Sequence, residues 1–89
     1  MRDKRFLQTL IGRYDVAGQT LEISFKGEGT IICAFSGQQA VELEPVRGMR
    51  FKSKDSDMFS MTFTKDEAGR VTGFTYVTMG YVIPAKRVD

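Results

Sequence analysis

The sequence predicts an all-β fold, a small antiparallel meander of about eight short strands that closes into a barrel. Three observations support this prediction. From residue 12 onward apolar residues alternate with polar ones, glycines separate the alternating runs, and neighbouring runs can pair as hairpins. A closed barrel is favoured over a sandwich because closure removes the exposed edges of a sheet. The chain has 89 residues, which predicts a single domain over residues 1–89.

One short helix is expected before the strands, over about residues 4–10. Apolar side chains recur there at helical spacing: Phe6, Leu7, Leu10 and Ile11. Asp3 is placed to cap the first turn, and Gly12 is placed to end the helix. So short a helix has little apolar surface for a membrane, and we therefore expect it to cover one end of the barrel. Residues 12–16 then form the first strand.

The first hairpin is predicted over residues 20–36. Pairing Phe25 with Ile31 places the apolar residues of both strands on one face, as matching side-chain parity requires. The same register sets Ile23 opposite Cys33, so the single cysteine belongs to the core, where a free thiol behaves as a small hydrophobe. A lone cysteine forms no internal disulfide, and it therefore indicates no particular redox compartment.

A second hairpin is expected around a turn at residues 45–48. Placing Leu43 opposite Phe51 keeps both apolar side chains inside the barrel. This register also sets opposite charges across from one another on the outer face, pairing Glu44 with Arg50 and Glu42 with Lys52. Each such pair contributes about 0.2–1 kcal/mol, so the charges agree with the apolar pattern.

A third hairpin is predicted to join residues 59–63 to residues 71–76 through a polar loop. The apolar spacing around Gly73 is three instead of two, which predicts a β-bulge that bends the strand. A last strand is expected over residues 81–88. Pro84 has no N–H donor, so it marks an edge, a bulge or the end of pairing in that strand.

The composition excludes most catalytic and metal-binding chemistry. The chain has no His and a single Cys, which removes triads with a His base and zinc sites built on His and paired Cys. Without His, a nucleophilic serine needs a lysine as its base, and no serine stands in a Ser-x-x-Lys motif. The acidic loops lack the spacing of an EF-hand. We therefore predict no catalytic residue, no cofactor-binding residue and no metal ligand.

The charge balance argues against nucleic acid as a partner. Lys and Arg number 13 and Asp and Glu number 11, which gives a net charge of +2. This excess is too small to predict binding to a phosphate backbone or to an anionic membrane surface. The apolar stretch near the N-terminus is interrupted by Gln8, Thr9 and Gly12, so no membrane span is predicted.

The one basic feature is a candidate docking face of four residues: Arg47, Arg50, Lys52 and Lys54. Three of them share one face of a strand by alternation. Phe51 lies at the opposite parity and offers no stacking platform for nucleic-acid bases. One interpretation is a solvated outer face that Glu42 and Glu44 partly neutralise. The other is docking on an acidic surface of a partner protein.

Aromatic side chains at inward positions are the candidate lining of a cavity: Phe25, Phe35, Phe51, Phe59, Phe63 and Tyr76. An eight-stranded barrel either fills with side chains or holds one small ligand. Large aromatic rings in so short a chain favour a filled interior, and a small apolar ligand is the alternative. The sequence does not indicate an oligomeric state.

Six segments stand in one order along the chain: Gly12-Arg13-Tyr14, Thr20-Leu21-Glu22-Ile23, Phe35-Ser36-Gly37-Gln38-Gln39, Leu43-Glu44-Pro45, Phe63-Thr64-Lys65-Asp66-Glu67-Ala68-Gly69-Arg70-Val71-Thr72-Gly73-Phe74 and Ile83-Pro84-Ala85-Lys86-Arg87-Val88. Together they resemble the small domain that follows the catalytic domain in many bacterial serine β-lactamase-like, penicillin-binding-protein-like hydrolases. The resemblance covers roughly residues 8–88, and its last segment is the most specific.

The resemblance implies a lipocalin-like barrel appended to an exported serine hydrolase, and hence a periplasmic or secreted location. It brings no catalytic residue, because the nucleophile and general base of such enzymes lie in the preceding domain. Residues 78–81 depart from the polar residues usual near the last hairpin. We expect a non-catalytic accessory domain that packs against, or gates, a neighbouring hydrolase domain of the same chain. The alternative is a lipocalin-like barrel that binds a small apolar ligand.

Overall fold

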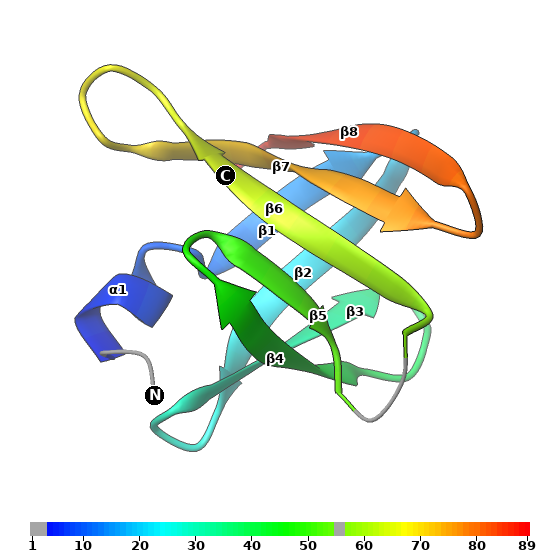
Figure 1. The fold of residues 1–89 in the computed structure, drawn as a ribbon, viewed down its shortest axis with the longest axis horizontal. Helices are drawn as coiled ribbons and strands as arrows, with labels where there is room; N and C mark the ends of the chain where they lie inside the picture. The colour runs from blue at the N-terminus through cyan, green and yellow to red at the C-terminus, as the bar shows by residue number, and fades with distance from the viewer. Residues whose placement is uncertain (1–3, 55–56) are drawn as a thin grey trace.

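The computed structural model describes residues 4–54 and 57–89, in which one short helix precedes eight strands. In chain order the elements are α1 (Lys4–Gln8), β1 (Gly12–Val16), β2 (Gln19–Lys26), β3 (Thr30–Phe35), β4 (Val41–Arg47), β5 (Arg50–Ser53), β6 (Phe59–Lys65), β7 (Val71–Thr78) and β8 (Tyr81–Arg87). Each strand pairs antiparallel with the next, and β8 pairs with β1 (Figure 1). The predicted all-β meander and its closure into a barrel are confirmed. The expected helix cap, Asp3, lies outside the described residues.

The connections between strands alternate between the two ends of the barrel (Figure 1). One end, which we call the helix end, carries α1 and the β2–β3, β4–β5 and β6–β7 connections: residues 4–11, 27–29, 48–49 and 66–70. The other, which we call the open end, carries the β1–β2, β3–β4, β5–β6 and β7–β8 connections: residues 17–18, 36–40, 57–58 and 79–80 among those described. As predicted, the helix covers one end of the barrel.

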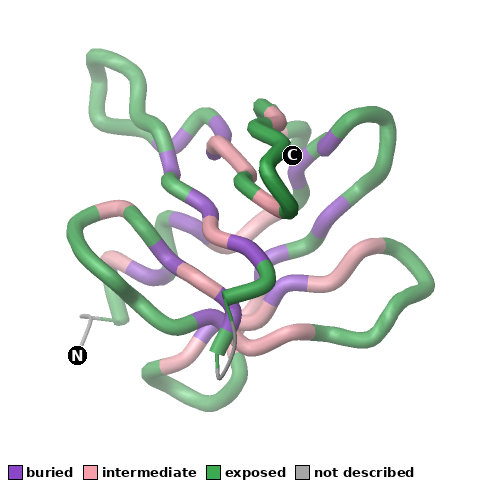
Figure 2. The backbone as a smooth tube through the Cα atoms, turned by 45° about the vertical axis from the view of Figure 1, so that its right-hand side comes forward, coloured by how far each residue is buried: buried purple, intermediate pink, exposed green. Residues whose placement is uncertain are grey.

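Inward-facing aromatic side chains fill the centre of the barrel. The rings of Tyr14, Phe51, Phe63 and Phe74 contact one another with centroids 5.0–6.0 Å apart. None of the four residues is more than 3% exposed. Tilted and edge-on ring pairs of this kind stabilise a core by about 0.5–1.5 kcal/mol each beyond the burial itself. Figure 2 shows buried and exposed positions alternating along the strands, as expected for a sheet with one face inside.

The first hairpin has the predicted register. Phe25 of β2 lies opposite Ile31 of β3, and Ile23 lies opposite Cys33. Cys33 is only 4% exposed, which confirms its place in the core. The first strand also has its predicted bounds, Gly12–Val16. Period-two alternation was sufficient here because every inward residue of the two strands is apolar.

The predicted bulge in β7 is confirmed. Val71 and Gly73 pair with consecutive residues of β6, so Thr72 between them is the extra residue of the bulge. A Cβ atom on Gly73 would collide with the backbone carbonyl oxygen of Ala85 in β8. Glycine is therefore required at this position, because the bulge brings the backbones of β7 and β8 into close approach.

The predicted register of the second hairpin is wrong by two residues. Leu43 lies opposite Ser53, and Phe51 lies opposite Pro45. Two features cause the shift. The turn consists of two residues, Gly48 and Met49, instead of the four expected at 45–48, and the register shifts by one residue between Pro45 and Arg47, as at a β-bulge. The outer-face pairs are accordingly Glu44 with Lys52 and Arg47 with Arg50, in place of Glu44 with Arg50 and Glu42 with Lys52. An even shift leaves every side chain on its predicted face.

The helix is shorter than predicted. It ends at Gln8, and Thr9 and Leu10 form a turn whose amides bond to the carbonyls three residues earlier. Such tight i→i−3 bonds are common where a helix ends. Gly12 does not end the helix but begins β1, with a φ of 152° that favours glycine.

Pro84 lies inside β8, opposite Thr75 of β7. Pairing between β8 and β1 extends only as far as Ala85, which lies opposite Val16. The missing N–H therefore falls where the ladder to β1 ends, which is one of the three predicted alternatives. The strand ends at Arg87, one residue earlier than expected.

Candidate functional site

One half of the predicted docking face, on β5 and its continuation, is neutralised by acidic neighbours. The Nζ atom of Lys52 lies 3.6 Å from Oε1 of Glu44 and 3.5 Å from Oδ1 of Asp57. The Nζ atom of Lys54 lies 3.0 Å from Oε2 of Glu42. Exposed pairs like these contribute little to stability, about 0–1 kcal/mol, but they cancel the charge that a partner would meet.

Glu42 pairs with a second cation, Lys26, in addition to Lys54. Lys26 of β2 donates to its Oε1 at 2.9 Å, while Lys54 approaches Oε2. Hydrogen bonds from Lys26 and then Lys54 hold the pKa of the Glu42 carboxyl below its ordinary value. Alternation predicted Glu42 on the outer face, but its partners come from the end of β2, which is separated from β4 by β3, and from the residue that follows β5.

The other half of the docking face is a pair of arginines that have no carboxylate partner among residues 4–54 and 57–89. Arg47 and Arg50 lie directly opposite each other, next to the two-residue turn of the β4–β5 hairpin. Neither forms an ion pair with any residue in the ranges 4–54 and 57–89. Like charges directly opposite destabilise a strand pair. We call these two residues the arginine pair. Their positive charges have no ion-pair partner within the described part of the chain.

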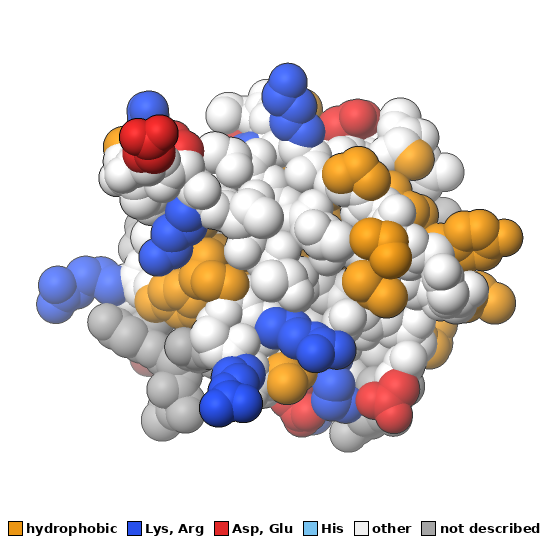
Figure 3. Space-filling view, turned by 45° about the horizontal axis from the view of Figure 1, so that its top comes forward, with side chains coloured by type: hydrophobic (Ala, Val, Ile, Leu, Met, Phe, Trp, Pro, Cys, Tyr) orange, Lys and Arg blue, Asp and Glu red, His pale blue; other side chains and the backbone are white. Residues whose placement is uncertain are grey.

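A surface groove of about 400 Å³ adjoins the arginine pair, between the β4–β5 hairpin and the end of β7. Four of its apolar side chains are exposed by 38% to 89%, namely Val46, Met58, Val77 and Met79, and a fifth, Phe59, is buried. We call this feature the apolar groove. Tyr81 and Val82 of β8 are also exposed, by 69% and 67%. Figure 3 shows hydrophobic side chains gathered on this face toward one side, with Lys and Arg side chains below them.

The aromatic residues predicted to line a cavity are distributed along the barrel from end to end. Phe25 lies at the helix end, where the Lys4 ammonium is 5.9 Å from the centroid of its ring. Phe51 and Phe63 lie in the centre, with their ring centroids 5.8 Å apart. These three rings pack against neighbouring side chains of the core.

The remaining three lie toward the open end. The Tyr76 ring contacts Phe59 and Phe35, with centroid distances of 5.2 Å and 6.2 Å. Phe59 is buried, whereas Phe35 and Tyr76 are half-buried. Burial raises the pKa of the Tyr76 hydroxyl. Five of the six side chains thus belong to one connected set of ring contacts, in which Phe74 joins the open end to the centre. Phe25 is in no ring pair within the described part of the chain.

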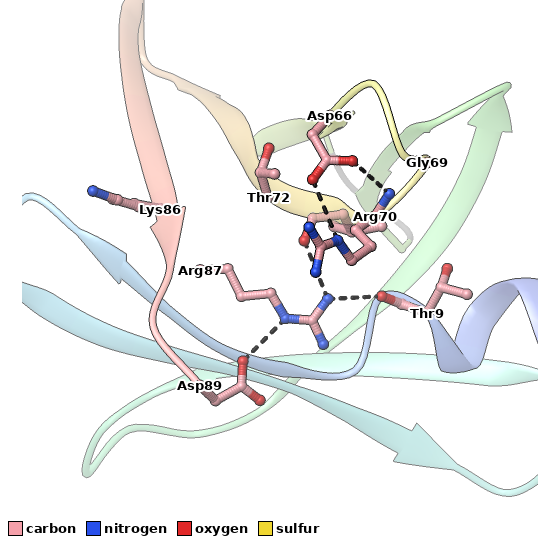
Figure 4. Close-up of a pocket in the computed structure, with 9 residues that line it drawn as sticks. Thr9, Asp66, Gly69, Arg70, Thr72, Lys86, Arg87 and Asp89 are labelled. Atoms are coloured by element: carbon pink, nitrogen blue, oxygen red, sulfur yellow. Dashed lines mark hydrogen bonds and ion pairs between the residues drawn. The ribbon is translucent and has the colours of Figure 1, made fainter.

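A hollow of about 660 Å³ at the helix end was not anticipated from the sequence. Its central residue is Arg87, whose guanidinium points toward the segment between α1 and β1 (Figure 4). One of its Nη atoms donates to the carbonyl oxygens of Thr9, at 3.0 Å, and Val71, at 3.4 Å. The other Nη donates to the carbonyl oxygen of Ile11, and Nε donates to Oδ1 of Asp89 at 3.0 Å. Arg87 therefore joins three segments of the chain: the α1–β1 connection, the start of β7 and the C-terminal residues that include Arg87 itself.

Two other charged groups of this hollow, Arg70 and Asp66, are also engaged within the fold, whereas Lys86 has no ion pair among the described residues. Arg70 lies 3.4 Å from the carboxylate of Asp66, whose Oδ1 accepts bonds from the amides of Arg70 and Ala68. The Arg70 amide bond is the main cause that lowers the pKa of Asp66. Sequence reasoning missed Arg87 because its backbone partners are 76 and 78 residues distant along the chain. We interpret this hollow as a structural fastening and not as a binding site.

The buried nucleophilic groups are held in their neutral forms. Burial raises the pKa of the Cys33 thiol to about 12, and burial also raises the pKa of the Tyr14 hydroxyl to about 12. A thiol is a nucleophile only as the thiolate, so Cys33 is not poised for catalysis. The Tyr14 hydroxyl donates to the carbonyl oxygen of Leu10 at 2.8 Å.

Within the described part of the chain, no group of three or more His, Cys, Asp or Glu side chains is arranged to hold a metal ion. No helix among these residues has both the length and the apolar character needed to cross a membrane. Comparison with known proteins found no matching family model, no matching curated protein and no matching solved structure.

Proposed function

We propose that this chain is a non-catalytic accessory domain that binds a neighbouring protein domain through its docking face. One observation carries the proposal: the apolar groove lies beside the arginine pair on the outer surface. A contiguous exposed apolar surface with a polar rim is typical of a protein-binding site. Four of its side chains are exposed although the same barrel buries sixteen apolar residues elsewhere.

The resemblance supplies the class of partner. It supports a serine β-lactamase-like or penicillin-binding-protein-like hydrolase domain, bacterial and exported, with this barrel as its accessory domain. The absence of His and of a Ser-x-x-Lys motif from the sequence fits a division of labour in which the nucleophile and base belong to the partner. Packing of the docking face on the hydrolase domain would position the barrel beside the entrance to the active site.

A lipocalin-like barrel for a small apolar ligand is the second candidate. It needs interior space, and here the interior is occupied by aromatic rings whose centroids are 5.0–6.4 Å apart. A ligand would have to displace Tyr76 and Phe35 at the open end and then break the contact between Tyr76 and Phe74. The packed interior is the reason for placing this candidate second.

Two measurements test the proposal. The purified chain, assayed with nitrocefin and with p-nitrophenyl acetate, should give no hydrolysis above the buffer rate. Hydrolysis that is lost on replacement of one side chain would overturn the non-catalytic assignment. The gene, or an adjacent gene, should encode a hydrolase domain with a Ser-x-x-Lys motif. That domain should bind the chain in calorimetry, and an absence of binding would overturn the partner assignment.

A further inference from the structure

We infer that the apolar groove is a peptide-binding site for an extended segment of a partner protein that carries apolar side chains flanked by carboxylates. The inference rests on the proposed docking function and specifies the site and the chemistry of its ligand. The apolar side chains of the segment would enter the groove. Its carboxylates would pair with Arg47 and Arg50.

The shape of the groove comes from three segments that are distant in sequence. Val46 comes from β4, Met58 precedes β6, and Val77 and Met79 come from the end of β7 and its turn. Methionine adapts its shape readily to an apolar partner, and two of the four exposed apolar residues are methionines. Met58 and Met79 are 69% and 89% exposed, so both side chains are accessible to a ligand.

The backbone at Met79 shows that the turn does not require a methionine side chain. Met79 and Gly80 form the β7–β8 turn with φ values of 48° and 83°. A two-residue turn with both residues left-handed favours Asn, Asp or Gly at the first position, because a larger side chain is strained there. The chain places an exposed methionine at this strained position, and such strain is often found where a residue contacts a ligand.

The charge at the groove selects the ligand. Lys52 already pairs with Asp57, which also lines the groove, and Lys54 pairs with Glu42. Arg50, which lines the groove, and Arg47 opposite it have no ion-pair partner among the described residues. Guanidinium groups pair with carboxylates in a planar, bidentate arrangement. An anionic bilayer is a weaker fit, because membrane attraction grows with the number of uncompensated cations and only two are available at this groove.

The inference is tested with two peptides and three variants. The first peptide is acetylated and amidated Ser-Asp-Leu-Phe-Asp-Ser, and the second has Lys in place of both Asp. The ¹⁵N-labelled chain is titrated with each peptide and followed by two-dimensional NMR. We expect the acidic peptide to shift the amides of Val46, Arg50, Met58, Val77 and Met79. The lysine peptide should bind at least tenfold more weakly.

The variants separate charge from folding. Arg50→Glu should weaken binding of the acidic peptide at least tenfold, whereas the matched control Arg13→Glu, an exposed arginine on β1, should leave it unchanged. Met79→Asn suits the left-handed turn and should weaken binding at least threefold while the remaining amide spectrum stays that of the folded barrel. These three results together would support the site.

Five outcomes would overturn it. Three come from the titrations: equal binding of both peptides, shifts centred on Phe35 and Tyr76, and no shift at millimolar peptide. The other two are Met79-dependent binding to vesicles of phosphatidylglycerol and phosphatidylcholine, and Met79-dependent self-association in sedimentation. Failure here is distinguishable from failure of the proposed function. A hydrolase domain that binds Arg50→Glu as tightly as the natural chain overturns only the groove, and peptide binding without hydrolase binding overturns only the partner.

Discussion

The two ends of the barrel differ in how far their apolar side chains are exposed. At the helix end, Leu7 and Leu10 cover the interior and are 2% and 0% exposed. At the open end, the turn residue Met79 is 89% exposed and the neighbouring Tyr81 is 69% exposed. Both ends are built from the same kind of hairpin connection, so the difference does not come from the strand topology.

The difference indicates which residues serve the fold and which serve binding. At the helix end Arg87 bonds to the carbonyl oxygens of Thr9 and Ile11 and so connects segments that are far apart in sequence. At the open end, apolar side chains remain in solvent, where they contribute almost nothing to the free energy of unfolding. Substitutions at the helix end should therefore change stability, and substitutions at the open end should change binding.

The largest effect is expected for Leu10→Ala at the helix end. Truncation of a fully buried leucine removes apolar burial and leaves a cavity, which costs about 2–5 kcal/mol. Urea unfolding followed by circular dichroism measures the loss. The control at the open end is Val82→Thr, a strand substitution at a 67% exposed position, which should change stability by less than about 0.5 kcal/mol. Equal losses of stability in Leu10→Ala and Val82→Thr would contradict the proposed difference between the two ends.

A somewhat smaller loss is expected for Arg87→Met. This substitution keeps the apolar stem but leaves the carbonyls of Thr9 and Ile11 without the charged donor, at a cost of about 1.5–3 kcal/mol. Arg70→Met is the matched control, since the Arg70 side chain is 82% exposed and its ion pair with Asp66 contributes less than about 1 kcal/mol. If both variants unfold at the same urea concentration, Arg87 is not a fastening.

The core also predicts a loss of stability in alkali. The folded chain holds the pKa of Cys33 at about 12 against an ordinary value of 9.0. Because the folded pKa is the higher one, the contribution of Cys33 is complete below pH 9 and is lost as the pH rises toward 12. We expect about 2 kcal/mol of this loss between pH 9 and pH 11. The free energy of unfolding of Cys33→Val, measured in urea at pH 9 and pH 11, should lack this part of the pH dependence. An identical pH dependence in both proteins would contradict the prediction.

The smallest effect, and the only one of opposite sign, is expected at the open end. Met79→Asn replaces a residue that is strained at a φ of 48° with one that tolerates the left-handed conformation. It should raise the free energy of unfolding by about 1 kcal/mol while it weakens peptide binding. Thermal unfolding with and without peptide measures both. A loss of stability would mean that Met79 belongs to the fold.

Much of the barrel was predictable because period-two alternation is a local signal. The register of the first hairpin and the bulge beside Gly73 both follow from the spacing of apolar residues. The β4–β5 hairpin was not predictable to the residue, because its charges fit two registers and the turn at Gly48 decides between them. A shift of two residues leaves the pattern of inside and outside positions unchanged, so the sequence alone contains no signal that reveals it.

The sites differ in the same way. Alternation predicted one outer face for Arg50, Lys52 and Lys54, and none of these three residues is buried. Arg47, which alternation did not place, lies opposite Arg50 beyond the register shift in β4. The division of this face into a neutralised half and an arginine pair was not predictable, since it depends on Asp57 and on the true register. Arg87 could not be recognised at all, because no local pattern relates it to backbone carbonyls 76 and 78 residues away.

Closure of the barrel has a consequence for how the protein behaves at high concentration. A sheet with no free edge offers no backbone template to another chain, so aggregation through strand addition requires one seam to open. The β1–β8 seam has three register pairs, from Tyr14 with Arg87 to Val16 with Ala85. Arg87 also bonds to the segment that leads into β1, so the same side chain that fastens the helix end keeps both edges of that seam hidden. Its replacement would make the folded protein more prone to aggregation even where most molecules remain native.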